Sequence, residues 1–185
     1  MIKLNDENYY SMESNQSYWS VSQYKDFCKC EAAAMAKIRG EYEQPMTKAM
    51  LIGTLVDRWF EGTLDKLKKE RPNIFYCRNG ALRADFRKAD EIIKRLQQDE
   101  RFMQYMSGEK QKILTFEMFG VPWKMKMDSF VEGICITDLK VVQNFKNLAF
   151  WRYDLQGAIY QAGADICGYG RLPFYLAVAT KDRVT

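Results

Sequence analysis

The chain contains no histidine among its 185 residues. Imidazole is the side chain that titrates nearest neutral pH, and it is a common metal ligand. Its absence excludes a histidine general base, Ser-His-Asp and Cys-His nucleophile systems, and histidine-ligated zinc. Chemistry on this chain must therefore use carboxylates, lysine, cysteine, tyrosine or a metal.

Cysteine is present but offers little for metal binding. The five cysteines are odd in number and contain no CxxC pair, which favours reduced thiols. Cys28 and Cys30 form a C-x-C pair that could be half of a metal or iron–sulfur site. The other three, at positions 77, 135 and 167, do not cluster to complete it. This spacing argues against an iron–sulfur cluster.

Long apolar runs are also missing, and none approaches the ~20 residues that a membrane span needs. Residues 1–18 are polar, lack the apolar core of a signal peptide, and are interpreted as a flexible leader. The net charge of +4 is only a mild bias towards polyanions. We therefore expect a cytoplasmic protein with no membrane partner and a single domain over residues 19–185.

Hydrophobic periodicity predicts the order of elements after the leader. Apolar residues at helical spacing predict helices near 20–40, 47–69, 84–106 and 147–165. Runs rich in β-branched and aromatic residues predict strands at 113–119, 123–131, 134–142 and 174–179. An antiparallel meander followed by a helical crossover to a fourth strand gives an α/β fold. Its mixed central sheet is flanked by helices, with extra helices on the N-terminal side.

Two of these strands carry charges where a buried pair should have none, in KMKMDSFVEGICITDLKVV (124–142). Strand side chains alternate faces, so Asp138 and Lys140 point the same way, about 7 Å apart. A tight turn at Glu132-Gly133 would bring Asp128 alongside Asp138. Carboxylates buried together need a compensating charge, and Mg²⁺ prefers carboxylate oxygens. The segment therefore predicts a divalent-cation site.

The helix that follows adds a second pattern, because Gln156 and Tyr160 are four residues apart and project from one face. Asp128, Ile136-Thr-Asp138-Leu-Lys140 and Gln156-x-x-x-Tyr160 together resemble the core of the PD-(D/E)XK nuclease superfamily. They are most similar to its RecE-like and lambda-exonuclease-like branch in phages and prophages. The resemblance implies a restriction-endonuclease-like core of helix, three-stranded antiparallel meander, helix and strand.

The resemblance also implies a set of metal ligands. Asp128 and Asp138 would hold Mg²⁺ (or Mn²⁺), together with the backbone carbonyl of Leu139. Gly53-Thr-Leu-Val-Asp57 is similar to the helix that supplies another ligand in that branch, although periodicity alone favours a solvated surface acid at Asp57. Glu117 is a secondary candidate, and an exposed strand acid is an equal alternative there.

Three further residues would act on the reaction by the same resemblance. Lys140 would position or deprotonate the attacking water, or stabilise negative charge that develops on the phosphorane. Gln156 would orient water or a phosphate, and Tyr160 would pack and hydrogen-bond behind the site. The implied activity is metal-dependent hydrolysis of DNA by water, most similar to an exonuclease that resects double-stranded ends in phage-type recombination. Implied partners are duplex DNA with a free end, a single-strand annealing protein and further copies of the chain.

The chain departs from its relatives at two ligands, since many have histidine in place of Asp57 and glutamate in place of Asp138. It also ends soon after its last strand, without the C-terminal elements of larger relatives. Two other hypotheses remain open. One is a nuclease fold that binds DNA or a recombination partner without cutting, and the other is a structural ion-pair cluster in an unrelated α/β protein.

Overall fold

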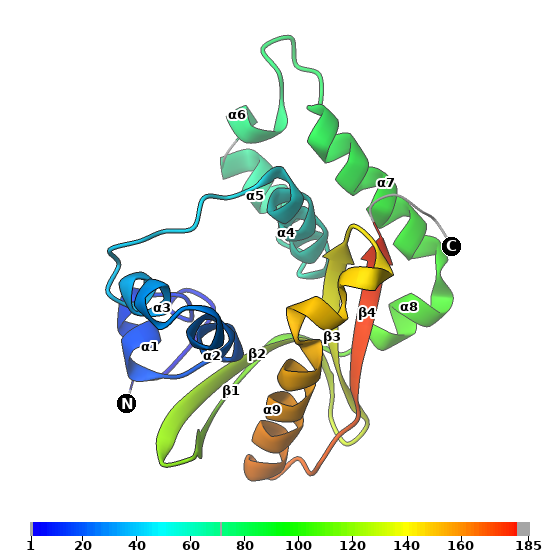
Figure 1. Ribbon diagram of the computed structural model, residues 1–185. Helices are drawn as coiled ribbons and strands as arrows, with labels where there is room; N and C mark the ends of the chain where they lie inside the picture. The colour runs from blue at the N-terminus through cyan, green and yellow to red at the C-terminus, as the bar shows by residue number, and fades with distance from the viewer. Residues whose placement is uncertain (1, 71, 181–185) are drawn as a thin grey trace.

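The computed structural model describes residues 2–70 and 72–180, and its centre is one four-stranded mixed sheet (Figure 1). The strands, in their order across the sheet, are β1 (Glu109–Met118), β2 (Val121–Val131), β3 (Cys135–Val142) and β4 (Phe174–Thr180). β1, β2 and β3 are antiparallel, and β4 pairs with β3 in parallel after the crossover helix α9 (Tyr153–Ile166). The predicted meander, helical crossover and α/β class are confirmed.

Helices cover the sheet on both faces, and each face has its own apolar core. One core contains Leu55 of α4 (Lys48–Phe60) and Ile92 of α7 (Ala84–Gln98), packed with Leu139 of β3. The other core contains Ile159 of α9 packed with Met127 and Ile136 of the sheet. In Figure 1, α9 lies in front of β3, and α4 and α7 lie towards the top of the view. β3, which carries Asp138 and Lys140, therefore lies between α4 and α9.

The helices on the N-terminal side are shorter than the periodicity predicts. Each expected helix is divided in two: α2 (Val21–Lys29) and α3 (Glu31–Ile38), α4 and α5 (Leu64–Glu70), α7 and α8 (Glu100–Tyr105). The first break falls at Cys30, which is extended, and the second at Gly62, which is left-handed with φ 73°. The third falls at Asp99, whose carboxylate accepts the Phe102 N–H at 2.9 Å and caps α8. Apolar spacing continues across these breaks, so periodicity does not reveal them.

Shorter elements complete the chain. α6 (Pro72–Phe75) follows α5, and the 3-10 turns η1 (Phe145–Asn147) and η2 (Ala149–Trp151) precede α9. The last helix begins at Tyr153 rather than near 147, because Arg152 has a left-handed backbone with φ 49°. Within the described ranges, no helix combines the length and the apolar character needed to cross a membrane.

Residues 2–18, interpreted from sequence as a flexible leader, pack against β2 and contain the helix α1 (Met12–Ser17). The side chain of Lys124 on β2 is buried. Its Nζ donates to the Tyr9 carbonyl (2.7 Å), Ser14 Oγ (2.8 Å) and Asn15 Oδ1 (2.7 Å). A buried ammonium group needs such acceptors, and this segment supplies them. The direction of the Lys124 side chain, which decides this packing, is not visible in the sequence.

Candidate active site

The site begins where β2 and β3 separate. The last paired residues are Ser129 and Thr137. Asp128 and Asp138 are the next residues on the two strands, and we call this point of separation the fork. Beyond that point Asp128 Oδ2, rather than a β2 carbonyl, accepts the Leu139 backbone N–H at 2.8 Å. The side chain thus satisfies a donor that the ladder leaves unpaired. The fork brings both carboxylates to one place, as the turn at Glu132-Gly133 predicted.

Asp138 is the most enclosed acid of the fork, with 3% of its surface exposed. Its Oδ1 accepts a hydrogen bond from Gln156 Nε2 at 2.7 Å. Its Oδ2 forms an ion pair with Lys140 Nζ, and no other described residue donates to that oxygen. Lys140 Nζ donates to the Leu139 carbonyl at 3.1 Å. The structure therefore brings Asp128, Asp138, Lys140 and Gln156 together.

α4 contributes Asp57 to the same site. The pKa of Asp57 is raised to about 8, chiefly by burial and then by the negative charges of Asp128 and Asp138, while Lys140 opposes the shift. A solvated surface acid would not respond in this way. Asp57 is therefore within electrostatic range of both fork carboxylates, as the family resemblance implies and periodicity alone does not.

The carboxyl groups of the site and Lys140 shift one another's pKa values. Burial raises the pKa of Asp138 to about 6, against the opposing charge of Lys140. Burial alone would lower the pKa of Lys140, but the carboxylates of Asp138 and Asp128 outweigh it and raise that pKa above its ordinary value. Burial is the main cause of the raised pKa values of Asp57 and Asp138, and the neighbouring carboxylates add to it while Lys140 opposes it.

The donor atoms of the site decide whether it fits a divalent cation. Across residues 2–70 and 72–180, no three acidic or cysteine side chains already stand at chelating distances from a common point. The donor set nevertheless suits Mg²⁺ or Mn²⁺, because it consists of oxygens, includes three carboxyl groups, and contains the buried Asp138 Oδ2, which accepts no hydrogen bond from a described residue. The residues that would hold the ion are Asp57, Asp128, Asp138 and the Leu139 carbonyl.

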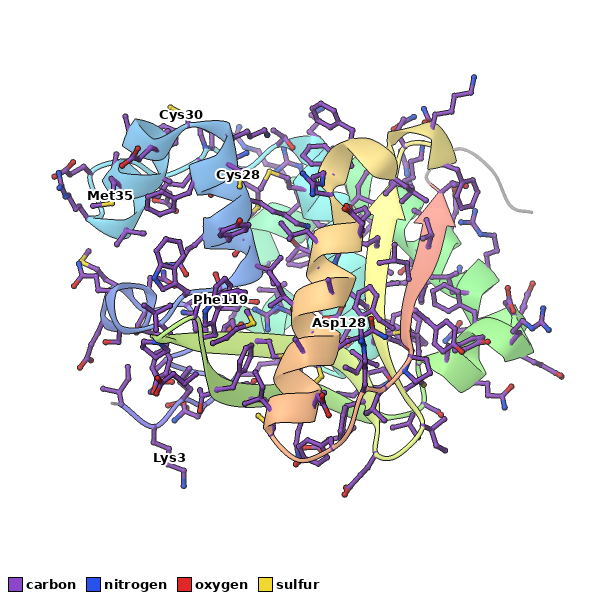
Figure 2. The ribbon with its side chains drawn as sticks, turned by 60° about the horizontal axis from the view of Figure 1, so that its bottom comes forward. Lys3, Cys28, Cys30, Met35, Phe119 and Asp128 are labelled. Carbon is purple, nitrogen blue, oxygen red and sulfur yellow. The ribbon has the colours of Figure 1, made fainter. Side chains whose placement is uncertain are left out.

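Glu117 does not belong to this group, so its candidacy as a ligand is wrong. It is exposed and pairs with Pro122 beside the β1–β2 turn. The residue of β1 that contacts Asp128 is Gln111, which lies between Lys110 and Lys112, the partners of Ser129 and Met127. Gln111 is six residues before Glu117 along the strand and so about 20 Å away from it. Figure 2 likewise shows Phe119, at that turn, well separated from Asp128. The register of β1 against β2 decided this, and the sequence did not reveal it.

Gln111 is a site residue that sequence reasoning missed. Its Nε2 donates to Asp128 Oδ1 at 3.2 Å, and its backbone is left-handed with φ 54°. A left-handed conformation costs a non-glycine residue about 1 kcal/mol or more and is often found at functional sites. Gln111 lies before the predicted start of its strand, so no periodic signal marked it.

Lys25 of α2 is a second missed residue. Its Nζ lies 5.0 Å from the centre of the Tyr153 ring, and Lys140 Nζ lies 5.7 Å from the same centre. Burial, with the nearby charge of Lys140, lowers the pKa of Lys25 to about 8. α2 therefore adds a second lysine beside the fork.

Tyr160 lies behind the fork and supports β2. Its hydroxyl donates to the Lys126 carbonyl at 3.0 Å, two residues before Asp128. Its ring packs edge-on against Phe174 of β4, with centroids 5.8 Å apart. Gln156 and Tyr160 thus lie on one face of α9, where the first holds Asp138 and the second holds the strand that carries Asp128.

Comparisons with known proteins found a matching family and a similar solved structure. The sequence model of a family described as a PDDEXK-like domain of unknown function (DUF3799) matches residues 20–185. A crystal structure of a Eubacterium rectale protein that carries the provisional name exonuclease is 44% identical, with a TM-score of 0.91. The similarity covers 98% of this chain and 75% of that one. No curated protein matches the chain.

Proposed function

The chain belongs to the PDDEXK-like family DUF3799, and from this premise we propose that it is a metal-dependent deoxyribonuclease. The family and the similar structure support a nuclease, for which DNA is the substrate. The observation that carries the proposal is the fork at which Asp128, Asp138 and Lys140 meet, with Gln156 bound to Asp138. Asp57, whose pKa responds to Asp128 and Asp138, adds a third carboxyl group to the site.

The residues of the site have different roles in hydrolysis. A bound Mg²⁺ or Mn²⁺ ion would supply Lewis-acid activation of water and phosphate. Lys140, charged and held beside Asp138, stabilises the negative charge that grows on the phosphate oxygens. Gln156 keeps Asp138 in one orientation through its 2.7 Å hydrogen bond. Water attacks directly, because none of these groups is placed as a covalent nucleophile.

The finer parts of the proposal rest on the resemblance to lambda-exonuclease-like enzymes. We infer that the protein is an exonuclease that resects double-stranded DNA ends in phage-type recombination. A single-strand annealing protein would bind the exposed strand, and further copies of this chain would enclose the duplex. The reaction would take place in the cytoplasm of a bacterial or phage-infected cell.

End-labelled linear duplex and closed circular duplex, incubated with Mg²⁺ or Mn²⁺, test the activity and its requirement for ends. We expect the linear DNA to be degraded and the circle to survive. Lys140→Ala and Asp138→Asn should each lower the rate at least about 100-fold. Glu117→Gln is the matched control, because it neutralises an exposed acid outside the site and should leave the rate unchanged.

A protein that leaves linear, nicked and single-stranded DNA intact with either metal would contradict the proposal. If that protein still binds DNA, the hypothesis of a nuclease fold that binds without cutting would replace it. A structural ion-pair cluster in an unrelated α/β protein is disfavoured already, because the chain belongs to the PDDEXK-like family.

A further inference from the structure

Exposed aromatic rings lie just before α9, beside the acidic fork. Phe150 is 70% exposed and Trp151 is 47% exposed. Their rings meet edge to face, with centroids 5.2 Å apart. Single exposed apolar residues are common on proteins, but two adjacent large aromatic side chains form a patch that calls for an explanation.

Lysines of α2 flank these rings. Lys29 Nζ lies 5.9 Å from the centre of the Phe150 ring and 5.5 Å from that of Trp151. Lys25 Nζ lies 5.0 Å from the Tyr153 ring centre. Neither lysine forms an ion pair with any residue that the structure describes. We call Lys25, Lys29, Phe150, Trp151 and Tyr153 the aromatic–lysine surface.

This surface is continuous with the acidic fork. The Tyr153 ring lies near Lys25 and also near Lys140, whose Nζ is 5.7 Å from its centre. Trp151 is two residues before Tyr153 in the chain. Figure 1 shows α2 beside α9, near the end at which α9 begins. A polymer that reaches Lys140 can therefore lie across the surface without leaving the protein.

We propose that the aromatic–lysine surface binds a single DNA strand next to the cleavage site. Unpaired bases stack on Trp151 and Phe150, and Lys25 and Lys29 contact the phosphates. The chemistry favours a single strand, because a duplex keeps its base faces stacked inside, whereas every unpaired base offers a face to an aromatic ring. The positive charge matches the phosphate backbone, and it carries no sequence preference. This inference rests on the proposed nuclease function, which supplies the strand.

The proposal also narrows the substrate class. A strand that lies on Trp151 and continues to Lys140 must be unpaired at the nucleotides that occupy the surface. DNA ends with a single-stranded portion should therefore bind more tightly than blunt ends, and a blunt end must open by a few base pairs before it is cut.

Binding is measured by tryptophan fluorescence on the full chain in the Lys140→Ala background, in chelator, so that no cleavage intervenes. The probes are a short single-stranded oligothymidylate and a blunt duplex hairpin. Trp151→Ala should lower the affinity for the single-strand probe about 5- to 100-fold, as expected when one base loses its stacking contact. It should leave duplex affinity nearly unchanged, and Trp151→Phe should restore most of the single-strand affinity. DNA with a fluorescent label repeats the titration for variants that lack Trp151.

Two further variants test separately the effect of an exposed aromatic ring outside the surface and the effect of a lysine charge on the surface. Phe119→Ala is the matched control, because Phe119 is 86% exposed but lies at the β1–β2 turn away from the fork. It should bind both probes like the parent protein. Lys29→Ala should reduce the slope of log affinity against log salt by about 0.7 on the single strand, the value for one phosphate contact.

The proposal would be overturned if Trp151→Ala weakened the binding of both probes equally. It would also be overturned if Trp151→Ala weakened single-strand binding no more than Phe119→Ala does. A Trp151→Ala variant that changes the sedimentation of the protein while single-strand affinity stays the same would overturn it as well, since the surface would then be a protein interface. These outcomes are distinct from failure of the nuclease proposal. That failure appears as absent cleavage by the wild-type chain, whatever the fluorescence titrations show.

Discussion

Asp57→Asn should stabilise the metal-free protein at pH 8 while removing part of its response to divalent cations. The folded protein raises the pKa of Asp57 from its ordinary value of 3.8 to about 8, chiefly through burial and the charge of Asp128. A carboxyl group with a raised folded-state pKa favours folding in its protonated form. Its contribution is complete below about pH 4 and is lost as the pH rises to about 8. Ionised Asp57 is therefore a cost that the asparagine variant removes.

The size of this cost follows from the shift. Each pKa unit corresponds to about 1.4 kcal/mol, and the interval between 3.8 and about 8 would give several kcal/mol in a site closed to water. Asp57 is only partly buried, so solvent screening reduces the expected gain to about 1–2 kcal/mol. The same carboxylate is a proposed ligand, and a ligand at 100 times its Kd stabilises a folded protein by about 2.7 kcal/mol.

Urea denaturation of wild type and Asp57→Asn measures both effects, in chelator and in excess Mn²⁺, at pH 4.5 and pH 8. We expect the variant to be more stable than wild type in chelator at pH 8, nearly equal at pH 4.5, and less stabilised by Mn²⁺. Glu117→Gln should match wild type under all four conditions. A variant that loses stability at pH 8 in chelator, or that keeps the whole Mn²⁺ effect, would refute the reasoning.

Two further predictions concern residues that support the site. Gln111→Gly should relieve the strain of the left-handed backbone and be about 1 kcal/mol more stable than Gln111→Ala in urea titrations. Both variants should lower Mn²⁺ affinity, because they remove the hydrogen bond to Asp128. Equal stability of the two variants would show that the backbone at φ 54° is not strained. Lys124→Met removes the donor that binds Tyr9, Ser14 and Asn15, so limited proteolysis should cut residues 2–18 faster than in wild type. Unchanged cleavage there would show that other contacts hold the segment.

Local regularities account for what the sequence alone determined. Strand alternation placed Asp138 and Lys140 on one face, and helical spacing did the same for Gln156 and Tyr160. The short turn after Val131 aligned Asp128 with Asp138, because the register of a hairpin follows from its turn. These signals extend over a few residues each, so the order of strands, the crossover and the core of the candidate site were all predictable.

Only the tertiary structure decided how distant segments meet. It placed Gln111 rather than Glu117 in contact with Asp128, brought α4 close enough to perturb the pKa of Asp57, and set Lys25 of α2 beside Tyr153. It also packed residues 2–18 onto Lys124, where the sequence predicted a flexible leader. Pairing register away from a tight turn, and the approach of a helix to a sheet, depend on packing between segments far apart in the chain. No short-range periodicity records that packing.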